Sequence, residues 1–166
     1  SQDNFYRKTA VEFCKNSINL SNKLGGDIYV AHAGYAEELL PPKDGHDVFN
    51  PVKETRNMIS GLSNDEFRGL KKTDSVRYKS IIRKIIDIDL DAVVKKTDYL
   101  IVHWDESVYR GGGTHGEVTL GYFLGKPIYL INKIPLDDLS SWIFSCSTEV
   151  FDSFDELKSF LAINYK

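Results

Sequence analysis

Cysteine is scarce in this chain, with Cys14 and Cys146 as its two examples among 166 residues. The two lie far apart in the sequence, which favours buried thiols of a reducing compartment over a disulfide. We therefore expect a cytoplasmic protein. The four histidines show no close spacing with the cysteines, so the sequence predicts no structural zinc site.

Long apolar runs are also missing. No stretch reaches the roughly 18 residues of a membrane span, and no signal peptide is visible, so no membrane association is expected. The net charge of −3 gives no electrostatic reason to expect duplex nucleic acid as a partner. Internal repeats and low-complexity tracts are absent too. The length of 166 residues then fits one domain, residues 1–166, with a real hydrophobic core.

Short β-branched runs alternate with longer amphipathic stretches along the chain. The pattern predicts strands at 27–31, 47–49, 99–104, 128–131 and 145–151, and helices at 6–21, 76–96, 114–124 and 153–163. Such alternation predicts an α/β fold with three layers around a mostly parallel sheet of four to five strands, in a Rossmann-like or flavodoxin-like arrangement. Ligands of such sheets bind beyond the carboxyl ends of the strands.

Three local features refine this outline. Prolines and glycines interrupt residues 39–77, which predicts an irregular lid or binding loop. Aspartates interrupt residues 76–96, so we expect two helices there, with Asp87 or Asp89 capping the second. Ser153 and Glu156 have the spacing of a capping box at the start of the last helix.

Two segments are expected at the carboxyl edge of the sheet. His32 and Gly34 follow the first strand, where a small residue lets a ligand approach the backbone. His32 is expected to contact this ligand; the alternative is a histidine with satisfied hydrogen bonds beneath the end of the sheet. Gly111, Gly112 and Gly113 are expected to form a flexible loop after the strand 99–104, and Glu117 then lies in the first turn of the next helix. A carboxylate there is well placed for chemistry, although it also complements the helix dipole. Thr114 can cap this helix, bind a ligand, or do both.

Three blocks resemble one enzyme family. They are IYVAHAGY at 28–35, DLDAVVKKTDYLIV at 89–102 and GGGTHGEVTLGYFLGKPIYLI at 111–131. In order and spacing they resemble the nucleoside 2-deoxyribosyltransferases and their relatives, the deoxynucleoside monophosphate N-glycosidases. The resemblance implies a nucleoside or nucleotide as substrate and a homo-oligomer as the assembly.

The resemblance also implies a role for each matched residue. Glu117 would attack C1′ of the sugar, Asp89 would help to protonate the leaving base, and Tyr29 would orient the glutamate. A carboxylate can stabilise the positive charge that builds on the sugar and then form a covalent ester with it. The sugar would pass to a second base or to water with retained configuration. No metal or other cofactor is needed for this chemistry.

The family pattern is broken at one position. The transferases often carry an aspartate six residues before the nucleophile, where Gly111 stands here. Asp105 is the carboxylate that can reach the same place from the end of the strand 99–104. Gly113 and Thr114 would then lie beside the sugar. The family resemblance therefore predicts neither which base the protein selects nor whether it transfers the sugar to a base or to water.

Three further interpretations stay open. The segment from Gly111 to Glu117 also resembles the PGGxGTxxE motif of the cytokinin-activating phosphoribohydrolases, which cleave an N-glycosidic bond on a nucleotide; Arg110 stands in place of the motif's proline. A catalytically silent module that binds nucleotides would also fit, because the aspartate is missing at Gly111. A structural protein without a small-molecule site is the third hypothesis.

Overall fold

Five parallel strands form the centre of the molecule. The computed structural model describes residues 28–31, 48–49, 58–59, 61–108 and 112–164. The strands are β1 (Ile28–Ala31), β2 (Val48–Phe49), β3 (Tyr99–Trp104), β4 (Ile128–Asn132) and β5 (Glu149–Phe151). They lie in the order β2-β1-β3-β4-β5, and every neighbouring pair is parallel. The predicted α/β fold with a parallel sheet is thereby confirmed, and the order is consistent with a Rossmann-like or flavodoxin-like arrangement.

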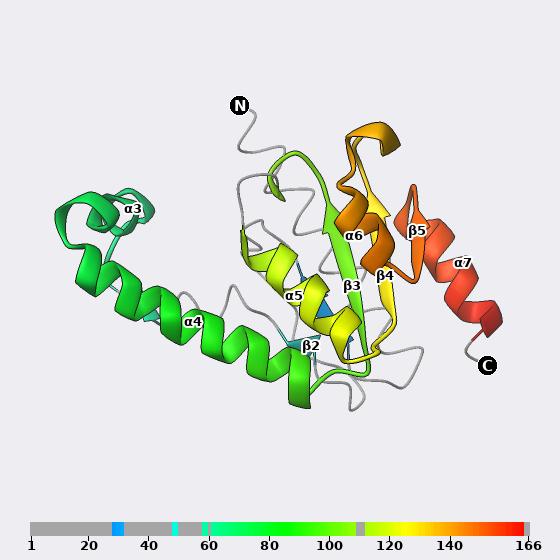
Figure 1. Cartoon of the computed structure of the whole chain (residues 1–166), viewed down its shortest axis with the longest axis horizontal. Helices are drawn as coiled ribbons and strands as arrows, with labels where there is room; N and C mark the ends of the chain where they lie inside the picture. The colour runs from blue at the N-terminus through cyan, green and yellow to red at the C-terminus, as the bar shows by residue number, and fades with distance from the viewer. Residues whose placement is uncertain (1–27, 32–47, 50–57, 60, 109–111, 165–166) are drawn as a thin grey trace.

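Helices are interleaved with these strands as β-α-β units. The structure places α3 (Asn64–Thr73) and α4 (Ser75–Lys95) before β3, and α5 (Gly112–Phe123) between β3 and β4. A short 3₁₀ helix, η2 (Leu136–Asp138), and α6 (Ser141–Cys146) precede β5, and α7 (Phe154–Asn164) follows it. Figure 1 shows α4, α5 and α6 against the sheet, with α3 and the first half of α4 projecting beyond its edge.

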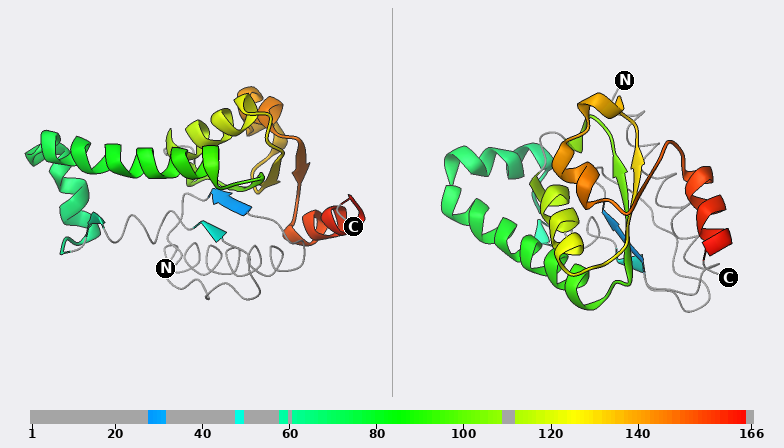
Figure 2. Two further views of the ribbon diagram at one scale, coloured as in Figure 1. Left: turned by 90° about the horizontal axis from the view of Figure 1, so that it is seen from below. Right: turned by 45° about the vertical axis from the view of Figure 1, so that its right-hand side comes forward.

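The side chains of β3 and β4 alternate between two hydrophobic clusters on opposite faces of the sheet. Leu100, Val102 and Trp104 pack with residues of α4, α5 and α6. Tyr99 and Ile101 pack with Leu157 and Leu161 of α7 on the other face. Figure 2 shows α7 on the side of the sheet opposite α4 and α5. Burial of β3 and β4 on both faces explains their continuous apolar sequences.

The segment 39–77 is less irregular than expected. Its described part contains helix α3, and the prediction of a loop is wrong there. Ser63 and Glu66 form a complete capping box at the start of α3, a signal that the sequence already contains. Asp74 then accepts a hydrogen bond from the backbone N–H of Arg77 at 3.0 Å and caps α4.

The prediction of two helices within 76–96 is also wrong. Helix α4 runs without interruption, and Asp87, Asp89 and Asp91 lie inside it rather than at a cap. An interior aspartate costs roughly 0.7 kcal/mol relative to alanine. The packing of Ala92 and Val93 into the core outweighs this local cost.

Two other boundaries differ from the prediction. Residues 141–146 are helix α6, so the expected strand at 145–151 shortens to β5. At the start of α7, the side chain of Ser153 accepts from the N–H of Glu156 at 3.2 Å, but the Glu156 carboxylate accepts from the N–H of Asp152. The expected capping box is therefore half formed. The helix predicted at 6–21 lies outside the described residues.

Candidate functional site

The carboxyl ends of β1, β3 and β4 meet at one edge of the sheet. Ala31 of β1 is in register with Val102 of β3, and Trp104 of β3 is in register with Asn132 of β4. Loops and helix starts that follow these strands therefore lie at the same edge of the sheet, and ligands of parallel sheets bind at this edge. Glu117, Asp105 and Thr114 follow β3 in the chain.

Glu117 is a buried carboxylate on α5. Helix α5 begins at Gly112, so the expected loop is wrong for Gly112 and Gly113, which are helical. Glu117 lies in the second turn of α5 and not, as expected, in the first. Burial of Thr114, Val118 and Gly121 against the sheet overrides the low helix propensity of glycine. The side chain of Glu117 is 7% exposed. Its Oε1 atom lies 3.9 Å from the place that a Cβ on Gly113 would take, so the carboxylate folds back towards the helix N-terminus.

Asp89 is a half-buried carboxyl group on the neighbouring helix. It lies one turn before Ala92 and Val93, which are buried in the core. Burial raises the pKa of Asp89 to about 6, because the charged form is poorly solvated there. A carboxyl group with a pKa near neutrality can hold a proton and give it to a leaving group.

The ends of α4 and α5 are joined through Lys126. Its Nζ donates to the carbonyl oxygen of Val94 at 3.3 Å and also to that of Thr97. Asp89 lies six residues before the last residue of α4, and Glu117 six residues before the last residue of α5. Both carboxyl groups therefore lie about 9 Å along their helices from these joined ends. Figure 1 shows α4 and α5 running side by side in the same direction.

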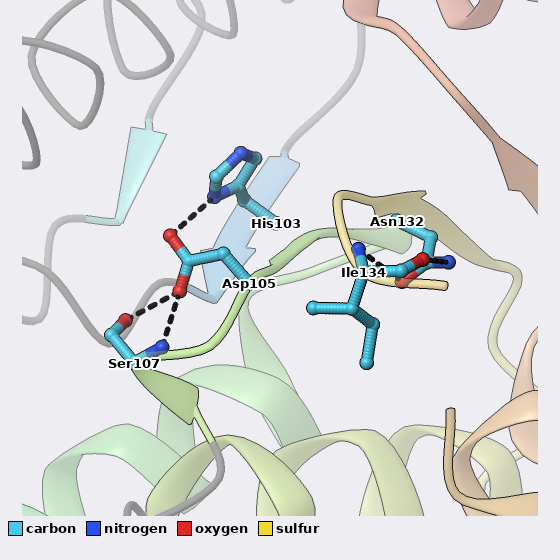
Figure 3. A network of polar contacts seen from close by, with 5 residues as sticks. All are labelled: His103, Asp105, Ser107, Asn132 and Ile134. Carbon is cyan, nitrogen blue, oxygen red and sulfur yellow. Dashed lines mark hydrogen bonds and ion pairs between the residues drawn. The ribbon is translucent and has the colours of Figure 1, made fainter. Parts of the chain in front are cut away.

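Asp105 is held by its own turn (Figure 3). Its Oδ1 accepts from the backbone N–H of Ser107 at 2.9 Å and from the Ser107 hydroxyl at 2.6 Å. Its Oδ2 lies 3.6 Å from Nδ1 of His103. Because Ser107 of the following loop holds one oxygen and His103 of β3 faces the other, Asp105 is fixed in position at the carboxyl end of β3.

His103 was not predicted as a site residue. It is 3% exposed and is the second-to-last residue of β3, where it is the polar residue within the run YLIVHW. Burial lowers the pKa of His103, while the charge of Asp105 acts in the opposite direction and that of Lys133 lowers it further. A polar side chain near the carboxyl end of an apolar strand is the signal by which the sequence points to it.

The remaining predicted residues are placed as follows. Thr114 is the third residue of α5 and is 5% exposed, so it is a buried helix residue and its predicted role as a cap is wrong. The backbone of Tyr29 pairs with Leu100 of β3. His32, Gly34, Arg110 and Gly111 lie outside the described residues. Glu117, Gly113 and Thr114 therefore lie within about one turn of each other on α5, and Asp89 lies on the neighbouring helix α4.

Several residues of the resembling blocks have structural roles. A Cβ on Gly121 would lie 3.1 Å from Cδ1 of Leu100, so glycine allows the close approach of α5 to the sheet. Gly125 has a φ of 69°, and the N–H of Lys126 bonds the carbonyl of Gly121, which is the Schellman end of a helix. Gly121 and Gly125 therefore support the fold, and the chemical roles of Glu117 and Asp89 stay predictions.

An open hollow of about 600 Å³ lies elsewhere, beside β4, α6 and β5. Its lining includes Asn132, Phe144, Glu149 and Asp152, and none of the predicted site residues. Asn132 is already engaged, because its amide donates to the carbonyl of Ile134 at 2.7 Å (Figure 3). We therefore assign the candidate site to the Glu117 region.

Comparisons with known proteins give no family assignment. No protein-family model matches the chain, and no curated protein sequence matches it. Within the described residues, no three His, Cys, Asp or Glu side chains gather closely enough to hold a metal ion. In that same part of the chain, no helix is both long and apolar enough to span a membrane.

Proposed function

We propose that this protein cleaves the N-glycosidic bond of a deoxynucleoside, a nucleoside or a corresponding 5′-monophosphate. The observation that carries the proposal is the pair of carboxyl groups on adjacent helices: Glu117, buried in α5, and Asp89, whose pKa burial raises to about 6. Two carboxyl groups in different environments are what acid-assisted glycosyl cleavage requires. The resemblance to the nucleoside 2-deoxyribosyltransferases and N-glycosidases indicates that the bond cleaved is the N-glycosidic bond.

The first step forms a glycosyl ester. An oxygen of the Glu117 carboxylate attacks C1′ of the sugar, the C1′–N bond breaks, and its electron pair goes to the base. Asp89 gives its proton to that nitrogen, so the base leaves neutral. Asp89 can do this at neutral pH because part of its population is still protonated at a pKa of about 6.

The second step releases the sugar. Water or a second base attacks C1′ from the opposite side and displaces Glu117, while Asp89 accepts the proton of the attacking group. Two inversions leave the configuration retained. Tyr29 is proposed to orient Glu117, and His32, Gly34, Asp105, Gly113 and Thr114 to line the substrate. The cytoplasm, where free nucleotides are abundant, is the proposed location.

The test is a panel of nucleosides and 5′-monophosphates, with and without a free acceptor base, analysed by chromatography. Base release alone identifies a hydrolase, and a new nucleoside identifies a transferase. Glu117→Ala should lower base release by about 10³-fold or more. The matched control is Glu106→Ala, which removes an exposed carboxylate two residues after β3 and should keep full activity.

Two outcomes would contradict the proposal. If Glu117→Ala retains wild-type activity, Glu117 is not the nucleophile. If the wild type binds nucleotides saturably by calorimetry but releases no base on long incubation, the protein is a nucleotide-binding module. The missing aspartate at Gly111 is the sequence feature that favours this second function.

A further inference from the structure

The first half of α4 lies outside the body of the protein. Figure 1 shows α3 and this half of α4 projecting as a hairpin beyond the sheet, and none of the residues from 61 to 91, all described, is buried. The two helices pack on each other through the rings of Phe67 and Tyr78, whose centroids are 5.2 Å apart. An apolar side of α4 is left in solvent: Val76 is 80% exposed, Ile86 45% and Val94 44%.

The residues along this exposed side follow a symmetric pattern. Val76, Arg83, Asp87 and Val94 are separated by intervals of seven, four and seven residues, so all four fall within one narrow face of the helix. All four are exposed. The pattern reads apolar, basic, acidic, apolar, and it is centred on position 85. We call these four residues the α4 seam.

We propose that the α4 seam is a self-association surface that pairs α4 with α4 of a second copy of this chain in antiparallel orientation. With the two-fold axis at position 85, each Val76 meets the other copy's Val94, and each Arg83 meets the other copy's Asp87. Every contact then occurs twice, as an isologous interface requires. The seam spans about 27 Å of helix, and Ile86 adds apolar surface at its flank.

The order of charges along α4 favours an antiparallel copy of the same helix as the partner. Within a quarter of a turn of the seam, residues 75–84 contain Lys79, Arg83 and Lys84 and no acid, whereas residues 85–91 contain Asp87 and Asp91 and no base. A parallel partner would set like charges against each other, and an antiparallel copy sets opposite charges together. A nucleic acid or a uniformly acidic peptide would complement only one half of the helix.

The stability of α4 on its own does not explain this charge order. Negative charge favours the start of a helix and positive charge its end. Helix α3 follows that rule, with Asp65 and Glu66 in its first turn and Lys71 and Lys72 in its last. Helix α4 follows the rule only at its two ends, with Asp74 at the N-cap and Lys95 in the last turn. Between these ends the order is reversed, because Arg77 and Arg83 precede Asp87 and Asp91.

The order of the central pair points the same way. Arg83 and Asp87 are four residues apart, with the base ahead of the acid, which is the weaker arrangement for a pair within one helix. Asp91 and Lys95 have the favourable order, and they form an ion pair in the structure.

The test is the oligomeric state of the full chain, measured by sedimentation velocity from low to high micromolar concentration. The wild type should be a dimer. Arg83→Glu should raise the dimer dissociation constant by more than about tenfold, because two like-charged pairs replace two opposite ones. Asp87→Arg should do the same, and Arg83→Glu/Asp87→Arg in one chain should restore the dimer. All these residues are exposed, so circular dichroism should show unchanged helix content.

The matched control is Arg77→Glu. It makes the same charge change on the same helix, about a quarter of a turn away from the seam, and should leave the dimer intact. A wild type that stays monomeric throughout the range overturns the proposal. So does a dimer that survives Arg83→Glu, one that Arg77→Glu dissociates, or one that the double variant fails to restore. None of these readouts depends on catalytic activity, so this experiment tests the surface independently of the proposed function.

Discussion

The side-chain amine of Lys126 donates a hydrogen bond to the backbone carbonyl oxygen of Val94 at 3.3 Å. A second bond from the same amine goes to the carbonyl oxygen of Thr97. The carbonyl groups at a helix C-terminus have no partner within the helix, and they carry partial negative charge. Lys126 satisfies this end of α4 from the loop that follows α5, and so fixes the lengthwise register of the two helices that carry Asp89 and Glu117.

Replacing this lysine should therefore destabilise the fold. We expect Lys126→Met to lower the free energy of unfolding by about 2 kcal/mol, because hydrogen bonds from a charged donor are lost and the carbonyls lose their partner. Urea denaturation followed by circular dichroism measures this loss. Lys71→Met, at an exposed lysine in the last turn of α3, is the control and should change stability by less than about 0.5 kcal/mol. Equal effects of the two substitutions would show that the Lys126 contacts do not support the fold.

The two glycines of α5 on opposite sides of the helix should respond differently to alanine. A Cβ on Gly121 would lie 3.1 and 3.2 Å from the two Cδ atoms of Leu100 and 3.3 Å from Cδ1 of Ile128, whereas a Cβ on Gly116 meets nothing within 4 Å. Gly116→Ala should stabilise the protein by roughly 0.5–1 kcal/mol through helix propensity. Gly121→Ala has the same favourable helix propensity but overpacks the core. Its free energy of unfolding should be about 1–3 kcal/mol lower than that of Gly116→Ala. Thermal unfolding of both variants tests this difference, and equal melting temperatures would refute it.

Asp89 should show opposite effects on stability and activity. The pKa of Asp89 is about 6 in the folded protein and near 4 in the unfolded chain, so as the pH rises from about 4 to 6 the unfolded state loses its proton first and the folded state is progressively disfavoured. Asp89→Asn removes this cost. The variant should melt at a higher temperature than the wild type near pH 8 and at the same temperature near pH 4.

The same substitution should abolish proton donation to the base, so the rate of base release should fall although the protein is more stable. In the wild type, base release should decline as the pH rises above about 6, because Asp89 loses its proton. If Asp89→Asn lowers the melting temperature near pH 8, the carboxyl group is not the buried, destabilised acid inferred from the structure. If it leaves base release unchanged, another group is the acid.

Much of the fold follows from local sequence patterns. Strand β3 is predicted with its observed bounds, and β4 to within one residue, because both are continuous apolar runs bounded by polar residues. Helix α3 was not predicted because Phe67 and Leu70 are surrounded by charged residues and give a weak apolar pattern. The capping box of Ser63 and Glu66 nevertheless marks its start. The continuity of α4 through three aspartates depends on tertiary packing, which no local propensity contains.

The candidate site is predictable in part for the same reason. A carboxylate after an apolar strand can be located from sequence alone, and Glu117 is found in this way. Its place in the second turn of α5 is not predictable, because the helix begins inside the glycine run once Thr114 and Val118 are packed. The raised pKa of Asp89 is set by burial, and the fixed position of Asp105 by its own turn, so both become visible only in three dimensions.

The covalent intermediate on Glu117 is the central claim, and the mass of the quenched protein tests it most directly. The wild type, mixed with a substrate from the panel and stopped with acid during turnover, should gain the mass of one sugar residue, with its 5′-phosphate if the substrate carries one. Digestion should place that mass on the peptide containing Glu117, and Glu117→Gln should show no added mass. An adduct on a different peptide, or base release by Glu117→Gln at the wild-type rate, would contradict the account.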